Sequence, residues 1–126
     1  NYNQNLTEQA RAQAMRLALR VPDLEIPNQI QGVVDLYDVS DDWIPIYDKS
    51  DLPGFYLAIG TSGNQYKNAP VVGKMMAELI NQCEKGRDHD QDPIIFHLEK
   101  MNRDINLNFY SRLREINRES SFSVLG

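Results

Sequence analysis

Two glycines between an apolar run and a helical pattern form the stretch of this chain best suited to chemistry. Gly60 and Gly63 can both take positive φ, so the segment between them is predicted to be a turn. The turn leads to Asn68, a residue type that caps helices, and to Pro70, which suits a first helical turn. Free N–H groups at a helix start, together with the helix dipole, could stabilise negative charge there. Alternatively the glycines only let the chain turn, because short glycine motifs recur by chance.

The elements on either side would position this turn. Phe55 to Ile59 is a short apolar run with aromatic and β-branched residues, which predicts a buried strand. A glycine inside a helix costs about 1 kcal/mol, so Gly73 predicts that another backbone packs closely against the helix. Small and apolar residues recur on one predicted helical face, namely Ala69, Val72, Gly73, Met76, Ala77 and Ile80.

Two motifs in this region resemble a known enzyme family. The stretch Gly54 to Ile80 contains Gly60-Thr61-Ser62-Gly63-Asn64, Tyr66, Ala69-Pro70, Gly73 and Ala77-Glu78-Leu79. It resembles the C-terminal flavin-contacting segment of the FAD-dependent oxidoreductases that include D-amino acid oxidase, sarcosine oxidase and glycine oxidase. Upstream, Leu36-Tyr37-Asp38-Val39-Ser40-Asp41-Asp42-Trp43-Ile44-Pro45-Ile46 is similar to the family's Leu-Tyr-x-x-Thr-Pro-Asp-x-x-Pro-Ile. The similarity covers roughly residues 6 to 83, and it departs from the family where Gln65 replaces a glycine and Asp41 a proline.

The resemblance implies a flavin site in this turn. Lys67 matches a lysine at the flavin and substrate pocket of monomeric sarcosine oxidase, so it would bind an anionic substrate or tune the flavin ring. The alternative for Lys67 is an exposed charge in the first helical turn. Asp35 stands where some members carry a cysteine bound covalently to FAD, which excludes that attachment here. The residues implied to contact FAD are Gly60, Thr61, Ser62, Gly63, Asn64, Gln65 and Tyr66.

The resemblance also implies a reaction class. The flavin of the family takes a hydride from a carbon next to nitrogen in a small amine or amino-acid substrate, and the cofactor performs the difficult step. No residue of this chain is therefore assigned as catalytic. A non-catalytic accessory or interaction module of the same fold is the alternative, and a G-x-G-x-x-G unit encoded upstream would discriminate between the two.

The resemblance further implies that residues 1–126 are the C-terminal portion of a larger enzyme. Residues 1–48 would belong to the substrate-domain side, 49–86 would return to the FAD-binding domain, and 87–126 would be a C-terminal extension. The G-x-G-x-x-G fingerprint is absent from the chain, so the N-terminal dinucleotide-binding part is expected to be a missing partner. The fragment alone is expected to be inactive and to hold no FAD.

Composition excludes several classes of function. The net charge of −5, from 13 basic and 18 acidic residues, argues against nucleic-acid binding. No apolar run approaches the length of a membrane span. The single cysteine, Cys83, permits no internal disulfide and agrees with a reducing, cytoplasmic compartment. Apolar faces left without a partner predict that copies of the fragment associate.

The rest of the chain predicts an α+β fold with two main helices, a small mixed β-sheet and a C-terminal β-hairpin. Leu6 to Arg20 is the first helix, with Asn5 and Glu8 as a capping box. Strands are expected over residues 31–37 and 43–47. A hairpin is expected from residues 94–99 and 105–110, joined by a turn at 102–104, and a helix over 94–101 is the competing interpretation.

Charged residues outside the turn predict surface more than chemistry. The carboxylates of residues 38–42 are expected to be solvated or to cap turns, and residues 84–93 are expected to form an exposed loop. His89 lies between two aspartates, but three adjacent side chains of an extended loop cannot all face one ion, so no metal site is predicted. Arg112, Arg114 and Arg118 would either contact a cofactor or the missing domain, or form a solvated segment.

Overall fold

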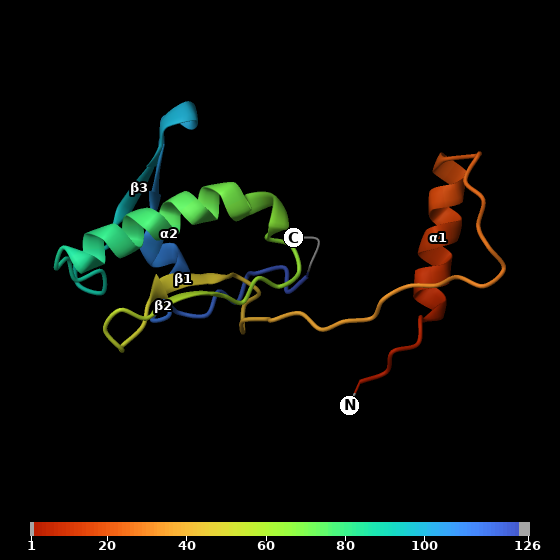
Figure 1. Ribbon diagram of the computed structural model, residues 1–126, viewed down its shortest axis with the longest axis horizontal. Coiled ribbons are helices and arrows are strands. Elements are labelled where there is room, and N and C mark those ends of the chain that lie inside the picture. Colours follow the sequence, from red (N-terminus) through yellow and green to blue (C-terminus); the bar gives the residue numbers. More distant parts are fainter. Residues whose placement is uncertain (1, 124–126) are drawn as a thin grey trace. The chain divides into compact units, whose positions relative to one another are not determined.

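The computed structural model describes residues 2–123 and has two compact units, Asn1–Leu36 and Tyr37–Gly126 (Figure 1). Each unit contains one α-helix, and the second unit also contains two hairpins. This division falls inside the stretch that the sequence assigned to the substrate-domain side. The two units are described separately below.

The first unit is built around α1, Glu8–Arg20, which confirms the predicted first helix. The cap is Thr7 and not Asn5, because the Thr7 hydroxyl accepts a hydrogen bond from the backbone N–H of Ala10 at 3.4 Å. The capping box predicted from Asn5 and Glu8 is therefore wrong.

The strand predicted over residues 31–37 does not form. No described segment pairs with it, and an unpaired strand leaves its backbone N–H and C=O groups to solvent. The segment instead runs as an extended chain in which Val33 and Leu36 are exposed. The apolar residues of this segment led to the strand prediction, but Val33 and Leu36 are not buried.

The second unit begins with an antiparallel hairpin made of β1, Ile46–Lys49, and β2, Tyr56–Ile59. Ile46 pairs with Ile59 and Lys49 pairs with Tyr56. The strand predicted at 43–47 starts later, because Trp43 has a φ of 61° and ends a turn that an extended strand cannot include. β2 agrees with the predicted strand, although its second half is exposed and not buried.

Helix α2, Ala69–Glu84, follows a single 3₁₀ turn over Tyr66–Asn68, and Pro70 lies at its start as predicted. Its buried residues are Met75 and Leu79, with Val72, Met76 and Cys83 half-buried. The buried face is thus rotated from the predicted one. The close backbone expected at Gly73 is also absent from the described residues, since no atom lies within 4 Å of the position a Cβ would take there.

A second antiparallel hairpin, β3 (Ile95–Leu98) and β4 (Arg103–Asn106), confirms the predicted C-terminal hairpin and excludes the competing helix. The connection is a 3₁₀ turn over Glu99–Met101 followed by Asn102 in the left-handed region. A further 3₁₀ helix, η3 (Leu107–Tyr110), occupies part of the predicted second strand.

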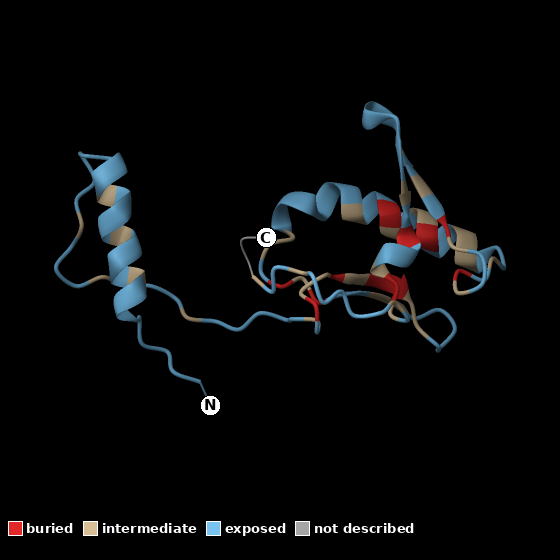
Figure 2. Cartoon of the chain, turned by 180° about the vertical axis from the view of Figure 1, so that it is seen from behind, coloured by how far each residue is buried: buried red, intermediate tan, exposed pale blue. Residues whose placement is uncertain are grey.

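The core lies where α2 and η3 both contact β1 (Figure 2). Its buried apolar residues come from four separate segments of the described chain: Tyr47, Met75, Leu79, Ile94 and Leu107. The unit is therefore a mixed α+β structure with two small antiparallel sheets in place of the predicted mixed sheet. No helix among the described residues is long and apolar enough to cross a bilayer.

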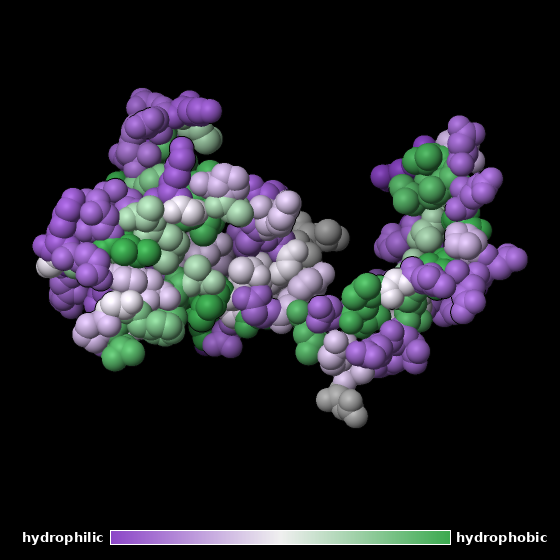
Figure 3. Space-filling view, in the orientation of Figure 1, coloured by the Kyte–Doolittle hydropathy of each residue, from purple (hydrophilic) through white to green (hydrophobic). Residues whose placement is uncertain are grey.

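Exposed apolar side chains predict that the chain self-associates. Apolar residues reach the surface of the second unit (Figure 3). Phe55, Ile59 and Ile80 are exposed, and no described strand pairs with the outer edge of β2. Light scattering over a concentration series should show a mass that rises above that of one chain. Ile59→Lys, which places a charge on the edge strand, should lower the association, and a monomer at every concentration would contradict the prediction.

Candidate functional site

The turn after β2 has an unusual backbone. Gly60, Ser62 and Gly63 all lie in the left-handed region, with φ of 67°, 51° and 77°. Ser62 is not a glycine, and a non-glycine residue in this region costs on the order of 1–2 kcal/mol. It is fully buried, and its hydroxyl donates to the carbonyl oxygen of Gly60 at 3.1 Å. The turn is thus held in one conformation by surrounding contacts.

Asp38 provides the strongest of those contacts. Its carboxylate accepts from the Thr61 hydroxyl at 2.6 Å and from the Thr61 backbone N–H at 3.1 Å. Its carbonyl oxygen accepts from the N–H of Ser62 at 2.9 Å. The hydrogen bonds from Thr61 lower the pKa of Asp38, so the carboxylate is ionised at neutral pH. Asp38 is exposed and accepts from a backbone N–H of the glycine turn, which agrees with the prediction of a solvated carboxylate or turn cap.

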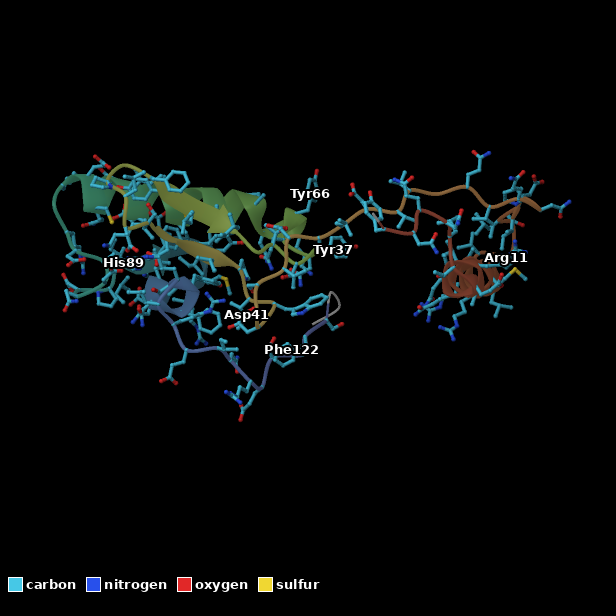
Figure 4. The ribbon with its side chains drawn as sticks, turned by 90° about the horizontal axis from the view of Figure 1, so that it is seen from below. Arg11, Tyr37, Asp41, Tyr66, His89 and Phe122 are labelled. Atoms are coloured by element: carbon cyan, nitrogen blue, oxygen red, sulfur yellow. The ribbon has the colours of Figure 1, made fainter. Side chains whose placement is uncertain are left out.

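The glycines of the turn make room for the same upstream segment. A Cβ on Gly63 would lie 2.6 Å from the ring of Tyr37, and a Cβ on Gly60 would lie 3.1 Å from Cβ of Ser40. The two motifs that carry the family resemblance therefore fold against each other. Figure 4 labels Tyr37 and Tyr66 near the N-terminal end of α2.

The backbone N–H groups of the turn divide into two sets. Those of Thr61, Ser62 and Asn64 donate to Asp38 and to the Thr61 carbonyl. Those of Gly63 and Gln65 have no acceptor among the described residues. Two donors thus remain in the turn that precedes the 3₁₀ segment Tyr66–Asn68 and the 16-residue helix α2, near the helix end that favours a negative charge.

Gln65, the residue that departs from the family pattern, belongs to a row of side-chain amides. Its Oε1 accepts from the Tyr47 hydroxyl at 3.3 Å and from Asn68 Nδ2 at 2.9 Å, and its Nε2 donates to Asn64 Oδ1. Asn68 occupies the N-cap position, but its side chain makes no capping hydrogen bond. The predicted capping role of the Asn68 side chain is therefore replaced by its contact with Gln65.

Tyr66 and Lys67 lie outside this network. Tyr66 is 96% exposed, and Lys67 is exposed in the 3₁₀ turn with no ion pair to a described residue. Both remain available to a partner or ligand. The structure therefore brings residues 60–65 together and leaves the next two at the surface.

A buried ion pair next to the turn has no counterpart in the sequence predictions. Asp42 is 1% exposed, and its carboxylate accepts from Arg114 Nη2 at 2.7 Å and from the N–H of Ile44 at 3.1 Å. Burial raises the pKa of Asp42, but hydrogen bonds from Arg114, Asn117 and Ile44 outweigh it and lower the pKa to about 2. These bonds flank Trp43 and stabilise its positive φ, which costs about 1–3 kcal/mol in a bulky residue. The prediction that the acidic turn is solvated is therefore wrong for Asp42, although it holds for the exposed Asp38 and Asp41.

A second buried cluster joins β1 to the C-terminal segment. Asp48 is fully buried and accepts from Arg112 through its backbone N–H at 2.8 Å and through Nη1 at 3.2 Å. Arg112 also reaches both carboxylate oxygens of Asp90, at 2.8 and 3.0 Å, and Lys49 pairs with Asp90 at 2.7 Å. The bonds from Arg112 lower the pKa of Asp90 to about 2. The sequence predicted that the arginines either contact a cofactor or the missing domain, or form a solvated segment. Arg112 and Arg114 do neither, because they bind aspartates of the same chain.

His89 is buried and not part of an exposed loop. Its Nδ1 accepts a hydrogen bond from the backbone N–H of Ile94 at 3.0 Å, and its Nε2 lies 3.8 Å from Asp48 Oδ1 without a hydrogen-bond partner. Burial lowers the pKa of His89, so the neutral ring is favoured. Among the described residues no group of three or more His, Cys, Asp or Glu could hold a metal ion.

Comparisons with protein-family models, with curated proteins and with solved structures found no match to this chain. Support for the implied flavin therefore comes from the geometry of the turn alone. Two unpaired N–H donors in a rigid turn at a helix start suit the electron-rich edge of a reduced flavin ring. The residues present fit that edge.

The buried histidine predicts acid destabilisation. Protonating His89 would add a hydrogen to Nδ1 and break its bond with Ile94, so the charged form is disfavoured in the folded state. A lowered pKa means that this stability is full above the ordinary value of 6.5 and is lost as pH falls below it. The free energy of unfolding should fall by up to about 1.4 kcal/mol per pH unit on this account.

The measurement is chemical denaturation between about pH 7 and pH 5. His89→Asn can keep an acceptor for Ile94 while removing the titrating ring, so its unfolding free energy should change less with pH than that of the parent chain. The exposed His97→Asn is the matched control and should leave the slope unchanged. Equal slopes for His89→Asn and the parent chain would contradict the prediction.

Proposed function

We propose that the chain is the C-terminal part of a flavin-dependent oxidoreductase that oxidises a C–N bond of an amine or amino acid. The observation that carries the proposal is the junction between the two motifs. Tyr37, Asp38 and Ser40 hold the turn, and the N–H groups of Gly63 and Gln65 remain without acceptors. Packing alone accounts for the two glycines. The N–H groups of the exposed Gly63 and the half-buried Gln65 stay available to a ligand because no described residue accepts from them.

In this proposal the turn 60–66 lies at the pyrimidine edge of the flavin. When bound, the cofactor accepts the hydride from the substrate carbon. The chain's own contribution is electrostatic: the two N–H donors and the positive end of α2 stabilise negative charge that develops at the ring edge. Because Asp38 and Ser62 already fix the turn, its donors need no rearrangement as the charge forms.

Lys67 is proposed to bind the anionic group of the substrate or to tune the ring. It is an exposed cation next to the free donors and pairs with no described carboxylate. The remaining contacts are proposed to come from the N-terminal dinucleotide-binding part. Because a single cysteine permits no internal disulfide, the enzyme is proposed to work in a reducing compartment, the cytoplasm. The second candidate is a non-catalytic module, which the exposed β2 edge favours as an interaction surface.

Lys67→Met in the full-length enzyme should lower kcat/KM for a carboxylate substrate by about tenfold or more, because a charge-assisted contact is worth about 1.5–3 kcal/mol. Its melting temperature should stay close to that of the parent enzyme, since Lys67 makes no ion pair within the described chain. Lys74→Met, an exposed lysine on α2, is the matched control. Unchanged stopped-flow flavin reduction in the Lys67 variant would remove the assigned role, and a full-length protein without flavin would support the module instead.

The 126-residue chain alone should hold no FAD at micromolar concentrations. The turn offers a few hydrogen bonds, each worth about 1 kcal/mol net, against an immobilisation cost of about 4–15 kcal/mol. The phosphate contacts of a dinucleotide come from a fingerprint that this chain lacks. Purified protein should be colourless after gel filtration. Yellow protein, or a micromolar complex in a titration with FAD, would contradict this prediction.

A further inference from the structure

A small pocket adjoins the row of amides at the start of α2. Its volume is about 260 Å³, slightly below the usual range of about 300–1,000 Å³ for ligand sites, which suits a ligand of one ring system. Four segments of the second unit line it, and they contribute aromatic side chains, side-chain amides and three serines. The aromatic ones are Trp43, Phe109 and Tyr110, and the amides are Asn64, Gln65 and Asn68.

Among the residues that the structure describes, no Lys, Arg, Asp or Glu side chain lines the pocket. A phosphate or carboxylate would find no cationic partner there, and an amine would find no carboxylate. Side-chain amides with aromatic surfaces instead recognise uncharged planar heterocycles, which stack on aromatic faces and hydrogen-bond through their edges. The lining therefore selects a neutral ring.

The orientation of Asn68 narrows the class of ring. One hydrogen of its Nδ2 donates to Gln65 Oε1 at 2.9 Å. The same oxygen of Gln65 accepts from the hydroxyl of Tyr47, a residue that is 3% exposed. The second Nδ2 hydrogen and Oδ1 remain for a ligand, since the side chain makes no helix cap. One donor beside one acceptor complements the N7 and N6 amino group of adenine, the pairing that asparagine makes with this base.

The aromatic wall is positioned at the expense of backbone strain. Trp43 adopts a φ of 61°, and the buried Asp42–Arg114 pair stabilises the turn that contains it. Strained residues that the surroundings over-determine are concentrated at binding sites. Tyr110 is fixed independently by ring contacts with Tyr47 and Phe109, whose centroids lie 5.1 and 5.0 Å away.

We propose that this pocket binds the adenine ring of an uncharged adenosine-type ligand, with Asn68 pairing with its N6/N7 edge and the aromatic residues stacking on its face. The site does not rest on the flavin proposal, because it uses side chains and not the free N–H groups of the turn. A 6-oxo purine would place an acceptor against Asn68 Oδ1. Turning the amide to suit it would break the bond with Gln65, so such purines should bind less well.

Trp43 is the only tryptophan, so its fluorescence reports directly on the pocket. The intact 126-residue chain is titrated with adenosine, inosine, ribose and riboflavin. Adenosine should quench saturably, with half-saturation in the millimolar range, and inosine should bind about tenfold more weakly, in line with a discrimination of about 1–3 kcal/mol per bidentate pair. Ribose should not quench saturably.

Variants test the role of the amide. Asn68→Ala should weaken adenosine binding about tenfold and remove the preference over inosine. Asn81→Ala, an exposed asparagine of α2, is the matched control and should change neither, with circular dichroism confirming that both variants fold. Absence of saturable quenching by adenosine, or equal binding of inosine by the parent chain, overturns the proposal. If riboflavin quenches saturably and adenosine does not, the adenine proposal is overturned and the flavin proposal is supported.

Discussion

Two buried aspartates that bind C-terminal arginines are the constraint on which the second unit depends. Asp48 on β1 and Asp42 before it are buried as ions and would be strongly unfavourable without Arg112 and Arg114. The apolar core has only five buried residues, which is little for a unit of this size. Removing one partner of a buried pair costs about 3–5 kcal/mol, so residues 111–117 are part of the fold and not an appendage.

The same ion pairs determine the geometry around the candidate site. The Asp42 carboxylate accepts from Arg114 and from the backbone N–H groups of Ile44 and Asn117, so the C-terminal segment fixes the turn that contains Trp43. Asp38, four residues earlier, holds the glycine turn through Thr61 and Ser62. One acidic segment thus positions two neighbouring features, the turn with its free donors and the aromatic pocket. Within this segment Asp42 is buried and Asp38 is exposed, yet both carboxylates hold neighbouring backbone in place.

The parts of the fold that the sequence predicted are those with local causes. The first helix, the order of strand, glycine turn and helix at residues 56–84, and the second hairpin follow from periodicity, Gly and Pro within short windows. The strand over 31–37 failed because pairing needs a neighbour that no local pattern can supply. The buried face of α2 was misplaced because β1, η3 and Ile94 decide which side of the helix is covered.

In the candidate site, too, the features with local causes could be predicted and those with distant partners could not. Residues 60–66 could be found from glycine spacing and a helix start, but Asp42–Arg114 and Asp48–Arg112 join positions 72 and 64 residues apart and leave no local signal. His89 was read as exposed because its neighbours are polar, although its ring is enclosed and accepts a bond from Ile94.

The glycines show how packing and function can use the same residue. A side chain at Gly63 would collide with Tyr37, which is sufficient reason for glycine whether or not a ligand binds. The presence of the glycines therefore does not by itself indicate a ligand. The N–H groups of Gly63 and Gln65 do support one, because they donate to no described acceptor. Gln65 adds to this argument, because its side chain bonds to Tyr47, Asn64 and Asn68 and so directs amide groups toward the neighbouring pocket. Gln65 thus connects the glycine turn to a neighbouring pocket with its own chemistry.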